Sequence, residues 1–150
     1  MTLTFRQAGR ADVTAIVALL ADDTLGATRE TADISVYLKA FDALRREAGN
    51  RLIVGTDEAG IVVATYQITF ISGLSLAATR RAQIESVRVA GHLRGQGVGK
   101  AMIEDAERRA RAAGCGLVQL TMNAVRTDSQ HFYESLGFTA SHIGFKRYLS

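Results

Sequence analysis

Apolar and polar positions alternate with different periods along the chain, and the first part reads as one strand followed by two helices. Leu3 to Gln7 alternates as a short strand does. Asp12 is a suitable N-cap for a helix whose apolar positions then follow helical spacing. A second helix is predicted over residues 33–46, because its apolar positions share one face and Gly49 ends it.

The period then changes to that of β-strands. Residues 51–56 and 61–71 are rich in β-branched and aromatic side chains, and a short segment with Gly60 separates them. This pattern predicts an antiparallel hairpin. A third strand is predicted over residues 82–89.

The second half mixes both kinds of element. The predicted order is a glycine-rich turn (91–99), a helix (98–113) stopped by Gly114, a strand (117–122), a helix (128–136) and one or two closing strands (138–148). Three acid–arginine pairs are expected on the solvent side of the helix over residues 98–113: Glu104/Arg108, Asp105/Arg109 and Glu107/Arg111. A helix between two strands implies a mixed α/β sheet with at least one parallel pair.

Composition indicates one globular domain over residues 1–150. Of the 150 residues, 47% are hydrophobic and 22% charged, and no proline-rich or serine-rich linker divides them. The lone Cys115 can form neither an internal disulfide nor a zinc cluster, so we expect no metal and a reducing compartment. The longest apolar run is residues 15–21 and no signal peptide is evident, which predicts a cytoplasmic protein without membrane contact.

The net charge of +3 permits several kinds of anionic partner. Arginines are mixed with acids along residues 98–113 and no aromatic-flanked basic stripe occurs, so nucleic acid is not expected as a partner. A local acidic excess comes from Asp22, Asp23, Glu30, Asp33 and Asp42. It would suit a cationic acceptor, or it is an ordinary solvated helical face.

The glycine-rich turn is the most informative segment. Glycines at alternate positions before a helix let backbone N–H groups converge on an anion such as pyrophosphate. The Walker pattern fails because Arg94 and Ala101 stand where glycine and a hydroxyl are needed, and the dinucleotide pattern fails because Lys100 stands at its third glycine. The alternative is a connector that binds nothing.

Two motifs in this order resemble a known family. Arg94-Gly95-Gln96-Gly97-Val98-Gly99 resembles the R/Q-x-x-G-x-G/A signature of the GNAT N-acetyltransferase superfamily, and residues 132–138 (FYESLGF) resemble its second hallmark. Residues 84–89 look like its central strand. The resemblance implies an α/β (α+β) fold with a mixed, mostly antiparallel sheet of six to seven strands flanked by about four helices.

The resemblance also implies acetyl-CoA as donor and particular cofactor contacts. Backbone amides of the turn would hold the pyrophosphate, with Arg94 as a charge partner, and the strand around Val87 would pair with the pantetheine arm. The family's usual asparagine is replaced by Arg126, which leaves the last pantetheine contact open among three residues. The implied cofactor-binding residues are Val87, Arg88, Val89, Arg94, Gly95, Gln96, Gly97, Val98, Gly99, Lys100, Asn123, Arg126 and Ser129.

Acetyl transfer to an amine needs a base and an acid. Glu85 is the expected base, directly or through water, because simple alternation puts it on the same side of its strand as Val87. Its alternative role is an ion pair with Arg80, Arg81 or Arg88. Tyr133 is the expected acid, since a phenol stays protonated at neutral pH; core packing is its alternative.

Two functions from different classes remain. The first is an N-acetyltransferase that acts on a primary amine through a ternary complex, and the second is a non-catalytic acyl-CoA sensor. Retention of both Glu85 and Tyr133 favours the enzyme. The acceptor stays open among small amines and peptide or protein amines. The apolar C-terminal positions Ile143, Phe145 and Tyr148 predict a strand edge that a second subunit would cover, and therefore a homodimer.

Overall fold

The computed structural model describes residues 2–22 and 26–150, so Asp23 of the acidic segment lies outside the described residues. The chain divides into two compact units, Met1–Gln119 and Leu120–Ser150. No helix in the described ranges is long and apolar enough to cross a membrane.

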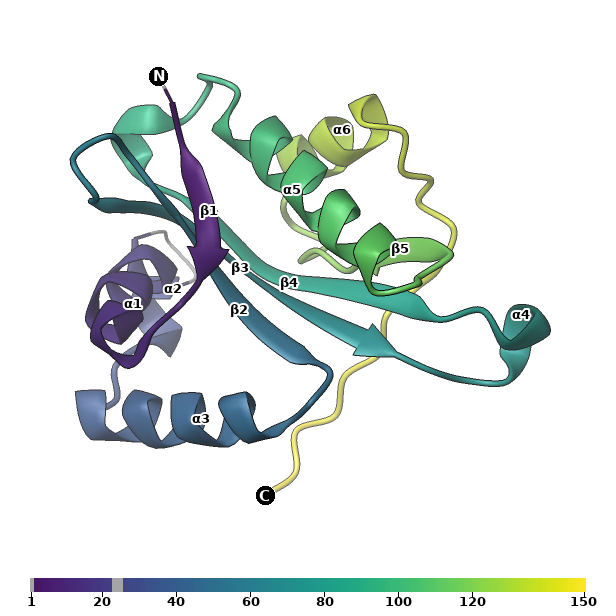
Figure 1. The fold of residues 1–150 in the computed structure, drawn as a ribbon, viewed down its shortest axis with the longest axis horizontal. Helices are drawn as coiled ribbons and strands as arrows, with labels where there is room; N and C mark the ends of the chain where they lie inside the picture. Colours follow the sequence, from purple (N-terminus) through teal and green to yellow (C-terminus); the bar gives the residue numbers. More distant parts are fainter. Residues whose placement is uncertain (1, 23–25) are drawn as a thin grey trace. The chain divides into compact units, whose positions relative to one another are not determined.

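A five-stranded sheet in chain order forms the centre of the fold (Figure 1). Its strands are β1 (Thr4–Gln7), β2 (Asn50–Thr56), β3 (Val62–Ile71), β4 (Arg81–Val89) and β5 (Leu117–Leu120). The pairs from β1 to β4 are antiparallel. Gly116 N–H donates to the Arg80 carbonyl over 2.8 Å, which joins the starts of β4 and β5, so these two strands run parallel. The expected parallel pair around a crossover helix is confirmed.

Helices cover both faces of this sheet (Figure 1). On one face lie α1 (Val13–Ala21) and α3 (Ile34–Arg46), and on the other lies α5 (Val98–Ala112). The core consists of the apolar faces of these helices against the sheet, with Ile16, Phe41, Ile53, Ile68 and Met102 among its buried side chains. The predicted helices and strands of this unit are therefore confirmed to within a few residues.

Two one-turn helices complete the first unit, and neither was predicted. They are α2 (Gly26–Arg29) and α4 (Ser75–Ala78). Three non-glycine residues of α4 (Leu76, Ala77 and Ala78) have left-handed backbone angles, with φ of 53°, 56° and 60°. Each such residue costs about 1–2 kcal/mol, so propensity rules argue against this turn.

The second unit contains α6 (Thr127–Ser135), which Gly137 ends at φ 94°. The predicted closing strands are wrong: no residue described after Phe138 is in a strand. The side chains of Ile143, Phe145 and Tyr148 are 83%, 93% and 89% exposed, so they do not pack against a neighbouring strand. A strand needs a ladder partner for its backbone groups. The described ranges contain five strands, below the six to seven expected. They also contain six α-helices, above the expected number of about four, and two short 3-10 helices, Arg10–Asp12 and Gly91–Leu93.

Candidate functional site

A β-bulge interrupts β4 next to the expected thioester contact. Thr65 pairs with Arg88 and Gln67 with Glu85, so one residue of β3, Tyr66, stands opposite two residues of β4. One of these two, Ser86, has a left-handed φ of 54°. Such a bulge leaves backbone groups unpaired at this point of the ladder, where a ligand's amide groups could bind.

The bulge corrects the expected geometry of Glu85. Directly paired residues point to the same face, so Glu85 shares its face with Gln67, and Arg88 shares that face with Thr65. The extra residue breaks simple alternation, and the inference that Glu85 and Val87 share a side by their spacing of two no longer holds. Val87 and Val89 are half-buried, whereas Glu85 is exposed.

The expected ion pair of Glu85 with an arginine does not form among the described residues. Arg80 donates to the Ser72 hydroxyl over 2.8 Å and lies over the Phe70 ring, and Arg88 donates to the Val87 carbonyl over 2.9 Å. No described hydrogen bond or ion pair uses the Glu85 carboxylate. A carboxylate exposed in this way is available to a substrate.

The glycine-rich turn leads from β4 into the N-terminus of α5. Gly95 and Gly97 have φ of 77° and 80°, a left-handed conformation that explains the need for glycine. A Cβ atom at either glycine would meet no other atom within 4 Å, so the space in front of the turn is open. Gly97 is the N-cap of α5 and provides no side-chain cap, which leaves the first N–H groups of this 15-residue helix available to an anion.

The side chains around this turn fit an anionic ligand. Arg94 is exposed and donates to the Asp22 carbonyl over 3.1 Å, which fixes it near the end of α1. Gln96 donates to the His92 carbonyl over 3.1 Å, Val98 is buried and anchors the helix start, and Lys100 is exposed in the first turn. The open glycine turn, the uncapped helix and these cations fit the pyrophosphate of a nucleotide-containing substrate.

A buried polar network holds α5 against the sheet, and none of the expectations from the sequence includes it. The Tyr66 hydroxyl donates to Asp105 over 2.5 Å, and Arg109 donates to the same carboxylate over 2.8 Å. Burial raises the pKa of Tyr66 far above its ordinary value, and the hydrogen bond to Asp105 adds to this effect. Asp105 is 7% exposed, so its expected place on the solvent side is wrong. Its spacing of seven from Val98 was the available signal for the buried face.

The second unit contains the other expected site residues. The Tyr133 ring makes edge contacts with Phe132 and Phe138, with centroids 5.1 and 5.9 Å apart. The Asn123 side chain accepts the Val125 N–H over 3.1 Å and so shapes the turn before α6. Arg126 is the N-cap residue of α6, and Ser129 lies in its first turn.

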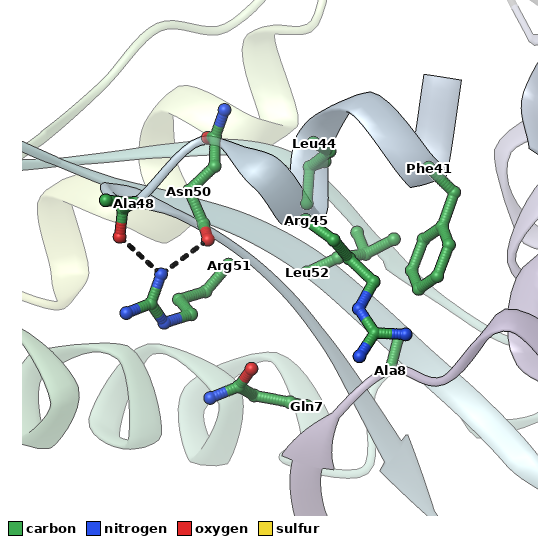
Figure 2. A pocket seen from close by; sticks show the side chains of 9 residues that line it. All are labelled: Gln7, Ala8, Phe41, Leu44, Arg45, Ala48, Asn50, Arg51 and Leu52. Carbon is green, nitrogen blue, oxygen red and sulfur yellow. Dashed lines mark hydrogen bonds between the residues drawn. The ribbon is translucent and has the colours of Figure 1, made fainter. Parts of the chain in front are cut away.

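One cavity of the first unit lies apart from the bulge and the glycine turn. It has a volume of about 460 Å³ and opens where β1 ends beside α3 and the start of β2 (Figure 2). Arg45 extends over the Phe41 ring beside it, and Arg51 donates to two backbone carbonyls. None of the expected site residues lines this cavity. The described residues contain no cluster of metal-ligating side chains, and Cys115 is a free thiol.

Comparison with known proteins gives a consistent result. A family model described as "Acetyltransferase (GNAT) family" matches residues 14–138. A curated protein, "Aminoalkylphosphonate N-acetyltransferase" of Salmonella typhimurium, is 36% identical over 67 residues, which are 45% of this chain and 44% of that protein. The match therefore spans less than half of the relative's length.

Solved structures match over nearly the whole chain. A transcriptional regulator from Bacillus halodurans C-125 is 38% identical with a TM-score of 0.93, and the match covers 99% of this chain and 100% of that one. An acetyltransferase from Trypanosoma brucei is 28% identical with a TM-score of 0.81, at coverages of 99% and 100%. Glucosamine-6-phosphate N-acetyltransferase from Arabidopsis thaliana, at 20% identity and a TM-score of 0.80, covers all of both chains and shares the fold.

Proposed function

Because the chain belongs to the acetyltransferase (GNAT) family, we propose that it transfers an acetyl group from acetyl-CoA directly to a primary amine in a ternary complex. One observation supports this most: the open left-handed turn at Gly95 and Gly97 leads into the uncapped N-terminus of α5. Family membership and the N-acetyltransferase relative support the same reaction class.

The proposed reaction uses one base and one acid. Glu85, directly or through a water molecule, takes a proton from the ammonium form of the acceptor. The amine nitrogen then forms a bond to the acetyl carbon, and the bond between that carbon and the CoA sulfur breaks. Tyr133 gives its phenolic proton to the departing sulfur, and the second proton that the nitrogen loses on becoming an amide restores the phenol through water. Exposure of Glu85 without an ionic partner among the described residues supports its part in this scheme.

The donor would bind along the first unit's turn and bulge. Backbone groups of β4 from Val87, at the bulge, to Val89 would pair with the pantetheine arm. The amides from Gly95 to Lys100 would hold the pyrophosphate, with Arg94 beside it. Asn123, Arg126 and Ser129 stay as proposed pantetheine contacts, although the bond from Val125 N–H already occupies one oxygen lone pair of Asn123.

Thermal unfolding with acetyl-CoA tests this proposal first. Ligand at about a hundred times its dissociation constant should add roughly 2.7 kcal/mol to the free energy of unfolding. Release of free CoA over a panel of amines then measures turnover. A melting temperature unmoved by millimolar acetyl-CoA or CoA would contradict the proposal, and ATP serves as the control ligand.

A regulatory function is the second candidate, and one observation favours it. The solved structure from Bacillus halodurans that matches over the whole chain is described as a transcriptional regulator. An acyl-CoA sensor would bind acetyl-CoA with the same turn but would release no CoA in the presence of any amine. Binding without turnover across the amine panel would therefore support the sensor.

We also propose a homodimer in the cytoplasm. The exposed apolar side chains of the C-terminal segment, Ile143, Phe145 and Tyr148, support a surface that a second copy covers, although they form no strand edge here. Sedimentation at micromolar concentration should give twice the 16.1 kDa chain mass. A single species at the chain mass would contradict the dimer.

A further inference from the structure

A row of polar side chains, uncharged except for Glu85 at its end, crosses one face of the sheet. It begins at Asn50 on β2, passes to Gln67 and Thr69 on β3, and reaches Glu85 on β4, directly opposite Gln67 in the register. The Asn50 Oδ1 atom accepts from Gln67 Nε2 over 3.1 Å and from the Thr69 hydroxyl over 2.6 Å.

The Glu47 carboxylate determines which way the side-chain amides of this row face. Asn50 Nδ2 donates to the Glu47 carboxylate over 2.5 Å. An ionised carboxylate can only accept hydrogen bonds, so the amide end of Asn50 must face Glu47 and its oxygen must face β3. Two donors at that oxygen agree with this orientation. Gln67 must therefore direct its NH₂ group toward Asn50.

The orientation of Gln67 has a consequence for Glu85. The nitrogen and oxygen of a carboxamide diverge from one carbon, so with Nε2 engaged by Asn50 on the β2 side, Oε1 is left to face other partners, of which Glu85 on β4 is the cross-strand neighbour. Cross-strand partners bring their Cβ atoms to about 4.5–5.5 Å. Gln67 and Glu85 are thus cross-strand neighbours that each carry acceptor oxygens, and no described hydrogen bond supplies a donor to Gln67 Oε1 or to the Glu85 carboxylate.

Adjacent acceptors without a donor repel each other unless a group rich in N–H bonds lies between them. A protonated primary amine has three such bonds and a positive charge. We propose that Gln67 Oε1 and Glu85 together bind the ammonium group of the acceptor, and that Asn50 is a positioning residue that acts through Gln67. This inference rests on the proposed function for its role in turnover, but binding of the ammonium group itself does not require turnover.

The first test measures binding without catalysis. In ¹⁵N-labelled protein at pH 7, the side-chain NH₂ signals of Gln67 are followed during titration with n-propylamine, which is protonated at this pH. We expect the Gln67 signals to shift, those of Gln96 to stay, and n-propanol to have no effect. Gln67 signals unmoved by the amine, or moved equally by the alcohol, would overturn the proposal.

The second test uses whichever amine the parent protein acetylates. Gln67→Met keeps the length of the side chain but removes the acceptor oxygen, and should raise the acceptor KM about tenfold or more while the acetyl-CoA KM is unchanged. Gln67→Glu restores an oxygen and should recover most of the affinity. Asn50→Leu should raise the acceptor KM by a smaller factor with little change in kcat.

Thr69→Val is the matched control, because it removes the other donor to Asn50 Oδ1 and leaves Gln67 in place. Its acceptor KM should stay within twofold of the parent value. An unchanged KM in Gln67→Met would overturn the inference and leave the proposed acetyl transfer intact. If the parent protein acetylates no amine, the proposed function fails, and the titration alone decides whether the ammonium group binds.

Discussion

Tyr66 on β3 and Asp105 on α5, 39 residues apart in the chain, share a buried hydrogen bond of 2.5 Å. Arg109 donates to the same carboxylate and, over 3.3 Å, to the Phe5 carbonyl on β1. The helix that begins at the proposed anion-binding turn is thus tied to both β1 and β3. The position of that turn depends on this network as well as on apolar packing.

Removal of the Tyr66 hydroxyl should destabilise the fold. Tyr66→Phe leaves the ring in place but deprives the buried carboxylate of one donor, at a cost of about 1–3 kcal/mol. For a chain of this size, that lowers Tm by roughly 2–4 °C per kcal/mol. Tyr37→Phe removes a partly exposed hydroxyl bond to Glu30 and should change Tm far less. Equal losses in both variants would contradict the importance of the network.

Acid should weaken the N-terminal part of the sheet through Asp12. Hydrogen bonds from Arg6 at 2.7 and 3.0 Å, and one from Gly9 N–H at 2.7 Å, lower the pKa of Asp12. The folded protein therefore holds the ionised form more strongly than the unfolded chain does. This contribution is present above the unfolded pKa near 3.9 and is lost as the pH falls through the folded pKa.

Unfolding of Asp12→Asn and the parent protein measured between pH 7 and pH 2 checks this. The variant should be less stable at pH 7, and the difference should shrink as the pH falls. Asp57→Asn, which alters a turn on the exposed hairpin, is the control. Its stability relative to the parent over the same pH range should show how much of the change follows from the loss of any carboxylate. A constant difference between parent and Asp12→Asn would show that Asp12 does not titrate with folding.

A matched pair of glycine variants should separate the turn's contribution to acetyl-CoA binding from the stability cost of backbone strain. Gly97 (φ 80°) and Gly60 (φ 81°) are both left-handed, and a Cβ at either meets no atom within 4 Å. Gly97→Ala and Gly60→Ala should therefore each cost about 1–2 kcal/mol of stability. Only Gly97→Ala should weaken acetyl-CoA binding, about tenfold or more, in a direct titration. If Gly97→Ala and Gly60→Ala bind acetyl-CoA with equal affinity, the turn does not contact the donor.

Loss of the Glu85 carboxylate should reduce turnover in a pH-dependent way. Glu85→Gln keeps the shape of the side chain but cannot accept a proton, so the rate should fall most at low pH, where the acceptor is fully protonated. The deficit should shrink as the pH approaches the pKa of the amine, about 10.4 for an alkyl amine. Glu58→Gln on the exposed hairpin is the control. A parent-like rate across the range would exclude Glu85 as the base.

Removal of the Tyr133 hydroxyl should slow the chemical step alone. Tyr133→Phe preserves the ring contacts with Phe132 and Phe138, so acetyl-CoA affinity should hardly change while kcat falls by roughly 10²–10⁴. Tyr148→Phe, which alters an exposed tyrosine of the same unit, should have no effect. If kcat of Tyr133→Phe equals that of the parent, the acid is another group.

Local sequence signals were sufficient for most elements of the fold. Helical spacing and capping residues predicted α1, α3, α5 and α6, because these signals act between residues close in the chain. The glycine turn before α5 was also predictable, since only glycine adopts φ near 80° without strain. The C-terminal apolar pattern predicted a strand that does not form. The same alternating spacing also occurs in segments that have no neighbouring strand to pair with.

Relations between distant residues were decided by tertiary structure alone. The bulge at Ser86 depends on how β3 and β4 align, and a single extra residue changes which side chains share a face with Glu85. Burial of Asp105 depends on the donor that Tyr66 brings from 39 residues away. The sequence by itself determined most of the helices and strands, the glycine turn and the family resemblance. Only the packed sheet decided that Gln67, oriented by Asn50, stands beside Glu85, because cross-strand register is a property of paired strands and of neither strand alone.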